Sequence, residues 1–240
     1  MSAAEDAPLE VFPEDWAKAL AVVAHPDDME YGAAAAVARW TAQGKSVAYV
    51  LVSDGEAGIT TMAPAETGPV RRAEQRESCA VVGVADVEFL GWPDGTIVEG
   101  LELRAELAAA VRRRRPDVVV SINFRESWGG RSWNHADHRA VGRALLDAVR
   151  DAANPWVFPE RGPAWDGVRF VAFSGSPQPS HIVDTSATFE TGVRSLAAHQ
   201  TYLEHLGGEM ASPDAFLRDA AVAAGRLLGV SYAATFEVIG

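Results

Sequence analysis

The fold is decided by the stretch LAVVAHPDDMEYG, residues 20–32, where an apolar run leads directly into His25 and two adjacent aspartates. The apolar run predicts a buried strand over residues 20–25, and Pro26 ends it because proline cannot donate to a strand ladder. The alanine-rich segment that follows predicts a helix over residues 29–42. The polar side chains therefore lie at a strand-to-helix turn, where open α/β sheets gather their ligand sites.

The same alternation of strand and helix continues along the chain. Strands are expected over residues 46–53, 87–91 and 117–122, and helices over residues 70–82, 101–115 and 136–150. Glycine or proline follows three of the expected helix ends, as helix stop signals require. The pattern predicts an α/β fold with a Rossmann-like, mostly parallel sheet and helices on both faces.

Beyond residue 150 the rhythm is broken by prolines. We expect a surface excursion with edge strands over residues 168–173 and 181–183, helices over residues 186–206 and 213–227, and a closing strand over residues 233–239. His181, His199 and His205 fall in these segments without a carboxylate at useful spacing, so we expect them to pack or to face solvent.

Composition limits the class of protein. A chain of 240 residues with 48% hydrophobic content favours one domain over residues 1–240, and the formal charge of −12 argues against a nucleic-acid partner. We identify no leader segment and no long apolar run, so we expect that the protein is neither exported nor inserted in a membrane. Cytoplasmic residence is therefore expected. Cys79 is the only cysteine, so a metal would have to use histidine and carboxylate ligands.

A second polar cluster, NHADHR at residues 134–139, follows the strand expected over residues 117–122. His25 and Asp28 are three residues apart and can face one point at the start of a helix, while Asp27 points elsewhere. Two ligands do not hold a catalytic zinc, which usually takes three protein groups and leaves a position open for water. The His135/His138 pair, at an equivalent strand end, is the expected source of the third.

Together, AHPDDMEYG at residues 24–32 and NHADHRAVG at residues 134–142 resemble the PIG-L/LmbE-like family of zinc-dependent deacetylases, which act on N-acetylglucosaminyl compounds. The resemblance implies that His25, Asp28 and His138 bind Zn²⁺. It also implies that Asp27 is the general base for attack of water on the acetyl amide of a small amino-sugar substrate.

Four further roles come from the resemblance. It implies that protonated His135 stabilises the oxyanion or protonates the departing amine, and that Asp137 orients His135 and favours its charged form. Arg71 and Asp94 match positions that contact substrate in relatives. Iron could occupy the same ligands as zinc.

Several alternatives remain open at this point. The substrate could be another amide, in a thiol-sugar conjugate or an N-acyl amino sugar of a secondary metabolite, or the chain could be a non-catalytic metal- or sugar-binding module. A homo-oligomer is compatible with the sequence. Trp128 and Trp133 lie in a long loop, residues 123–134, beside the expected metal, where they could stack on a sugar ring or pack into the wall of the site.

Overall fold

Successive residues of the central strands pack on opposite faces of one sheet. In β2 (Lys18–Val23), Ala19, Ala21 and Val23 belong to one hydrophobic core, and Leu20 and Val22 belong to the other. A strand buried on both faces reads as a continuous apolar run, which is why the sequence pattern identified it. The computed structural model describes residues 8–240; residues 1–7 of the domain expected over 1–240 lie outside the described part.

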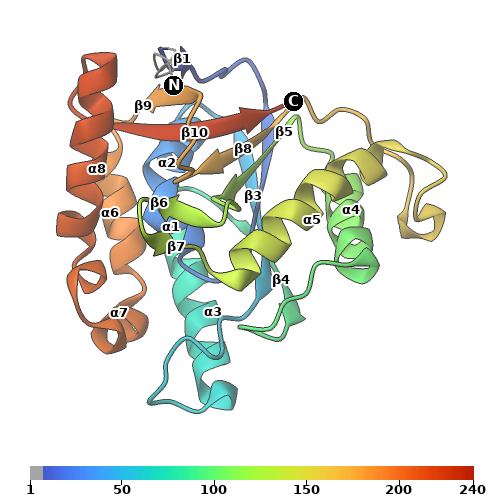
Figure 1. Ribbon diagram of the computed structural model, residues 1–240, viewed down its shortest axis with the longest axis horizontal. Coiled ribbons are helices and arrows are strands. Elements are labelled where there is room, and N and C mark those ends of the chain that lie inside the picture. The colour runs from blue at the N-terminus through green and yellow to red at the C-terminus, as the bar shows by residue number, and fades with distance from the viewer. Residues whose placement is uncertain (1–7) are drawn as a thin grey trace.

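The sheet has eight strands, in the order β1-β9-β10-β8-β5-β2-β3-β4 (Figure 1). The remaining strand bounds are β1 (Glu10–Val11), β3 (Ser46–Ser53), β4 (Asp86–Trp92), β5 (Val118–Ile122), β8 (Val171–Ser174), β9 (His181–Asp184) and β10 (Ala233–Ile239). Neighbouring strands run parallel except where β10 pairs with β8 and β9. The predicted α/β fold with a mostly parallel sheet is confirmed.

Helices cover both faces of the sheet (Figure 1). One core is closed by α4 (Leu101–Arg114) and α5 (Ala136–Ala153), and the other by α2 (Ala34–Ala42) and α3 (Pro64–Val81). The shorter or outer elements are α1 (Asp28–Gly32), α6 (Phe189–Ala197), α7 (Gln200–Leu206), α8 (Pro213–Leu228), the 3₁₀ turns Pro159–Arg161 and Glu209–Ala211, and the hairpin of β6 (Ser127–Gly129) and β7 (Ser132–Trp133). Within residues 8–240, no helix is both long enough and apolar enough to cross a bilayer.

Three expected elements differ from the structure. The helix expected over residues 29–42 is interrupted at Ala33, next to Gly32, where an added Cβ would lie 2.5 Å from Ser174 Oγ. The helix expected from residue 70 begins at Pro64, which suits a first helical position. The helix expected over residues 186–206 is two helices, α6 and α7.

The expected edge position of the strand near residues 168–173 is wrong. All four residues of β8 are buried, and the strand lies inside the sheet between β5 and β10. Proline-rich flanks made the segment look like a surface excursion, but its own residues are apolar on both faces, as an interior strand requires. Strands β1 and β4 form the edges of the sheet.

The topology brings the two polar clusters together. From β2 the chain builds outward through β3 to β4, and it later returns to place β5 on the other side of β2. The order therefore reverses between β2 and β5, and the carboxyl ends of these parallel strands meet at such a switch point. The turn after β2 and the segment that opens α5 lie at that edge.

Candidate metal and catalytic site

The turn after β2 directs its two aspartates apart. Asp27 has φ 85°, a left-handed conformation that costs a non-glycine residue about 1–2 kcal/mol. Its backbone N–H donates to Gln75 Oε1 at 2.9 Å, while the N–H of His25 donates to Asp28 Oδ2 at 2.9 Å. The sharp turn lets Asp28 approach His25 and sends the Asp27 carboxylate to the other side, toward Arg71.

Three predicted ligand side chains converge. His138 Nε2 lies 3.2 Å from His25 Nδ1 and 3.1 Å from Asp28 Oδ1, and His25 Nδ1 lies 3.7 Å from Asp28 Oδ2. A tetrahedral zinc with bonds of about 2.0–2.1 Å separates its ligand atoms by about 3.3 Å. Two imidazoles and one carboxylate, with a position left open, are the donor set of a catalytic zinc site, so the residues present fit the metal.

Each imidazole is held by an oxygen on its far side. His138 Nδ1 lies 2.9 Å from Asn134 Oδ1, and His25 Nε2 lies 3.0 Å from Asp94 Oδ1 and 3.1 Å from Asp137 Oδ2. These oxygens can only accept, so each ring in its neutral form carries its proton there and turns its lone pair toward the convergence point, as ligand histidines do. Burial acts to lower the pKa of His25, but the Asp28, Asp137 and Asp94 carboxylates outweigh it and hold that pKa well above its usual range.

Two groupings have donor atoms that all lie within 4.8 Å of one another: His25, His135 and His138, and His25, Asp94 and Asp137. Asp28 belongs to neither grouping, because its Oδ1 faces His138 and its Oδ2 faces His25. In the second grouping, backbone N–H groups already donate to the carboxylates: Gly95 and Ile97 to Asp137, and Ala57 to Asp94. Those carboxylates are therefore better placed to orient His25 than to bind a cation themselves.

Asp137, expected to orient His135, meets that ring through its backbone N–H, while its carboxylate faces His25. The Asp137 carboxylate is fully buried and accepts from His25 Nε2 and from the Gly95 and Ile97 amides. His135 instead caps α5, because its Nδ1 accepts the backbone N–H of Asp137 at 3.1 Å. Burial lowers the pKa of His135, and the neighbouring His25 and His138 lower it further, so the ring is favoured as the neutral form with its proton on Nε2.

Arg71 and Asp94, which are expected to contact substrate, pair in the structure with neighbouring residues of the protein. Arg71 is 2% exposed and donates to the carbonyls of Pro26 and Gly55, at 2.6 and 3.1 Å. Its guanidinium also pairs with Asp27 Oδ2 at 3.1 Å. Arg71 thus holds the turn and the base candidate, as Asp94 holds His25.

Asp27 has the environment of a general base. Burial and the charge of the Asp28 carboxylate raise its pKa to about 6, despite the opposing charge of Arg71. A carboxylate with a pKa close to neutrality is ionised at pH 7 and can still carry a proton once it has taken one.

Sequence reasoning missed a buried polar layer behind Asp27. Gln75 accepts from the Asp27 N–H and donates to Glu30 Oε1 at 2.8 Å, and the Ser78 hydroxyl donates to the same oxygen at 2.8 Å. Burial raises the pKa of Glu30 to about 7. The available signal was the polar stripe Arg71, Gln75 and Ser78, which recurs at helical spacing in a helix that packs on the core. Asn134 was also missed, although it stands directly before His135.

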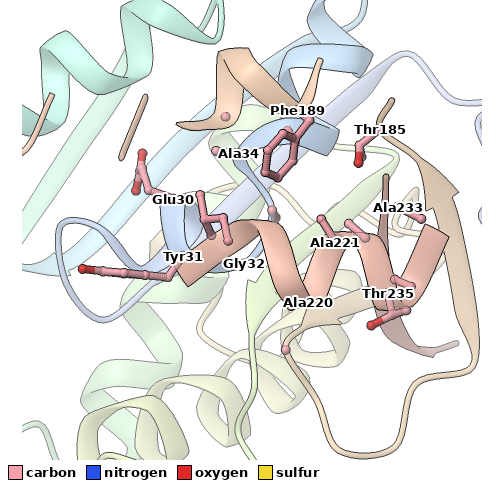
Figure 2. Close-up of a pocket in the computed structure, with 17 residues that line it drawn as sticks. Glu30, Tyr31, Gly32, Ala34, Thr185, Phe189, Ala220, Ala221, Ala233 and Thr235 are labelled. Carbon is pink, nitrogen blue, oxygen red and sulfur yellow. The ribbon is translucent and has the colours of Figure 1, made fainter. Parts of the chain in front are cut away.

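A separate cavity of about 150 Å³ lies between α2, α6, α8 and β10 and is lined largely by alanines (Figure 2). In Figure 2, the side chains of Glu30 and Tyr31 extend away from the alanines of α8. The Tyr31 hydroxyl donates to the Met210 carbonyl at 2.9 Å. This cavity does not contain the converging ligands.

Comparison with known proteins agrees with this geometry. A family model described as GlcNAc-PI de-N-acetylase (PIG-L) matches residues 20–149. Diacetylchitobiose deacetylase of Thermococcus kodakarensis is 27% identical over 91% of this chain and 82% of that protein. The 1D-myo-inositol 2-acetamido-2-deoxy-alpha-D-glucopyranoside deacetylase of Geodermatophilus obscurus is 31% identical over 61% of this chain and 58% of that protein. The solved structure of N,N′-diacetylchitobiose deacetylase from Pyrococcus horikoshii aligns with a TM-score of 0.82 and 25% identity, over 94% of this chain and 85% of that one.

Proposed function

Because the chain belongs to the PIG-L family, we propose that it is a zinc-dependent hydrolase that removes the acetyl group from an N-acetylglucosaminyl compound or a related amino sugar. One observation carries the proposal. His138 Nε2 lies 3.2 Å from His25 Nδ1 and 3.1 Å from Asp28 Oδ1, while the neighbouring Asp27 pairs with Arg71 and has a pKa of about 6.

His25, Asp28 and His138 would hold the metal. Zinc bound there would act as a Lewis acid that polarises the amide carbonyl and makes water more acidic. Two neutral imidazoles and one carboxylate leave one net positive charge at the centre, which suits an electrophile. The same donors also suit iron, so metal analysis belongs in the test.

Asp27 would carry out both proton transfers, first as the base that accepts a proton from water and then as the acid that protonates the departing nitrogen. When water adds to the amide carbon, its proton passes to the Asp27 carboxylate, and the C–N bond then breaks as Asp27 returns the proton to the departing nitrogen. Arg71 fixes the carboxylate at 3.1 Å for this task. The products are acetate and a free amine.

His135 would stabilise the oxyanion as a hydrogen-bond donor. Its Nδ1 accepts the Asp137 N–H, so a neutral ring presents its single proton at Nε2. A donor aimed at developing negative charge contributes to catalysis without giving up its proton. This differs from the protonated His135 implied by the family resemblance, because the pKa of His135 is lowered.

Two variants test the proposal with purified, zinc-loaded protein and N-acetylated amino sugars. Asp27→Asn should keep stoichiometric zinc and lose turnover by roughly 10²–10⁴-fold, since a general base contributes that much. His138→Ala should lose both zinc and turnover. Release of free amine and metal content are the measurements. Near wild-type turnover in Asp27→Asn contradicts the base assignment, and failure of the wild-type protein to hydrolyse any N-acetylated amino sugar contradicts the function.

The acid released defines the acyl group. Acetate alone supports the proposal, whereas a longer acid would move the substrate to another amide with the same catalytic residues. Sugar binding without hydrolysis in zinc-loaded protein would instead favour a non-catalytic module.

A further inference from the structure

Arg71, which holds the proposed base, is covered by an aromatic side chain from a helix near the end of the chain. The Arg71 guanidinium donates to the carbonyls of Pro26 and Gly55 and pairs with the Asp27 carboxylate. Its face is left for Tyr202 of α7, whose ring centre lies 4.0 Å from the guanidinium carbon. A guanidinium over an aromatic ring at this distance is a stabilising contact, and it is stronger where water is excluded. Tyr202 therefore packs directly on the residue that fixes Asp27.

The hydroxyl of Tyr202 meets the same carboxylate. Burial acts to raise the pKa of Asp27, and a hydrogen bond with Tyr202 is one of the interactions that act to lower it. Burial and the charge of Asp27 raise the pKa of Tyr202 itself, so the phenol keeps its proton and is the donor in this hydrogen bond. A phenylalanine could stack on Arg71 but could not make this second contact.

The first turn of α7 is fixed on α3, the helix that carries Arg71. The Thr201 backbone N–H donates to Glu74 Oε1 at 2.6 Å, about one helical turn along α3 from Arg71. His199, which directly precedes α7, is fully buried. Tyr202 is thus brought to the turn after β2 by an anchored segment.

We propose that Tyr202 is a positioning residue of the hydrolysis: its hydroxyl donates to the Asp27 carboxylate and, together with Arg71, keeps that carboxylate turned toward the attacking water. The inference rests on the proposed function and adds to it a residue beyond the part of the chain that the family model matches, residues 20–149. A carboxylate held by two donors has less freedom to rotate, and such fixed geometry speeds the chemical step. Because Tyr202 acts through Asp27, its loss should affect kcat and leave KM unchanged.

The first test uses Tyr202→Phe, which removes the hydroxyl and keeps a ring over Arg71. With zinc-loaded protein and N-acetylated amino sugars, kcat should fall about tenfold or more, the size of one lost hydrogen bond to a charged group. KM and zinc content should stay at their wild-type values.

Tyr232→Phe is the matched control. Tyr232 directly precedes β10, the Arg218 guanidinium carbon lies 5.4 Å from the centre of its ring, and its hydroxyl accepts a hydrogen bond from the same arginine. The control thus removes a hydroxyl from a second tyrosine–arginine pair, away from Asp27, and its kcat should be that of the wild type.

A double-mutant cycle separates this inference from the proposed function, because it needs no turnover. Urea unfolding compares zinc-loaded wild type, Tyr202→Phe, Asp27→Asn and the double variant. A direct contact should make the effects of the two substitutions on the unfolding constant non-additive by about fivefold. Tyr232→Phe combined with Asp27→Asn should give additive effects. Coupling between Tyr202 and Asp27 supports their contact even if no N-acetylated sugar is hydrolysed and the proposed function fails.

Three results would overturn the inference: a wild-type kcat in Tyr202→Phe, a kcat that falls only together with zinc content, or additive effects of Tyr202→Phe and Asp27→Asn. A higher KM with unchanged kcat belongs to the first result and would make Tyr202 a substrate contact instead.

Discussion

Asp137→Asn should weaken zinc binding without touching a metal ligand. The Asp137 carboxylate accepts N–H groups from His25 at 3.1 Å, from Gly95 at 2.7 Å and from Ile97 at 3.1 Å. An amide has only one oxygen, so its NH₂ group must face one of these donors. Loss of a carboxylate that orients a ligand imidazole costs about 10–100-fold in metal affinity, or about 1.4–2.7 kcal/mol. The charged hydrogen bonds it made to the fold add about 1.5–3 kcal/mol of lost stability.

The assay pairs a chelator competition titration for zinc with urea unfolding of the metal-free protein. Asp151→Asn is the control, because Asp151 lies on the same helix, is largely buried and pairs with Arg104 at 2.9 Å, at the end remote from the site. It should lose stability while zinc affinity stays within about twofold. Wild-type zinc affinity in Asp137→Asn, or an equal loss in Asp151→Asn, refutes the reasoning.

Two other substitutions probe the buried polar layer. Gln75→Leu removes the acceptor that holds the Asp27 N–H, so kcat should fall roughly tenfold or more with zinc content intact; an unchanged kcat would show that the turn holds without Gln75. His199→Phe removes an imidazole whose pKa burial lowers to about 3. Below pH 6.5 the unfolded chain protonates His199 and the folded chain does not. The free energy of unfolding of the wild type therefore falls by up to about 1.4 kcal/mol for each unit by which the pH drops, and the variant does not have this loss. Urea unfolding at pH 7 and pH 5 should show that the variant becomes more stable relative to the wild type as the pH falls. A difference in free energy of unfolding that is the same at both pH values would contradict a neutral His199.

The core strands and the meeting of the ligands could be predicted from sequence because both follow from short-range patterns. Leu20 and Val22 alternate with Ala19 and Ala21 in a strand buried on both faces, so the run is apolar throughout. Once strand ends are placed, parallel topology brings the residue after one strand next to the residue after another.

Side-chain partners could not be predicted in this way. Asp137 lies two residues after His135, in the first turn of α5. Its carboxylate accepts hydrogen bonds from His25 and from backbone amides of residues 95–97, which come from distant parts of the chain. The break at Ala33 likewise depends on the approach of Gly32 to Ser174 in β8. Such choices depend on packing between distant segments, and no local pattern encodes them.

Asn134 links the β6–β7 hairpin to His138. Its side chain donates to the carbonyls of Asn123 and Arg125, at the base of the β6–β7 hairpin, and its oxygen accepts from His138 Nδ1 at 2.9 Å. A hairpin grafted from a relative would therefore also alter how firmly His138 is oriented. Such exchanges should join the new loop between Asn123 and Asn134 and leave both asparagines in place.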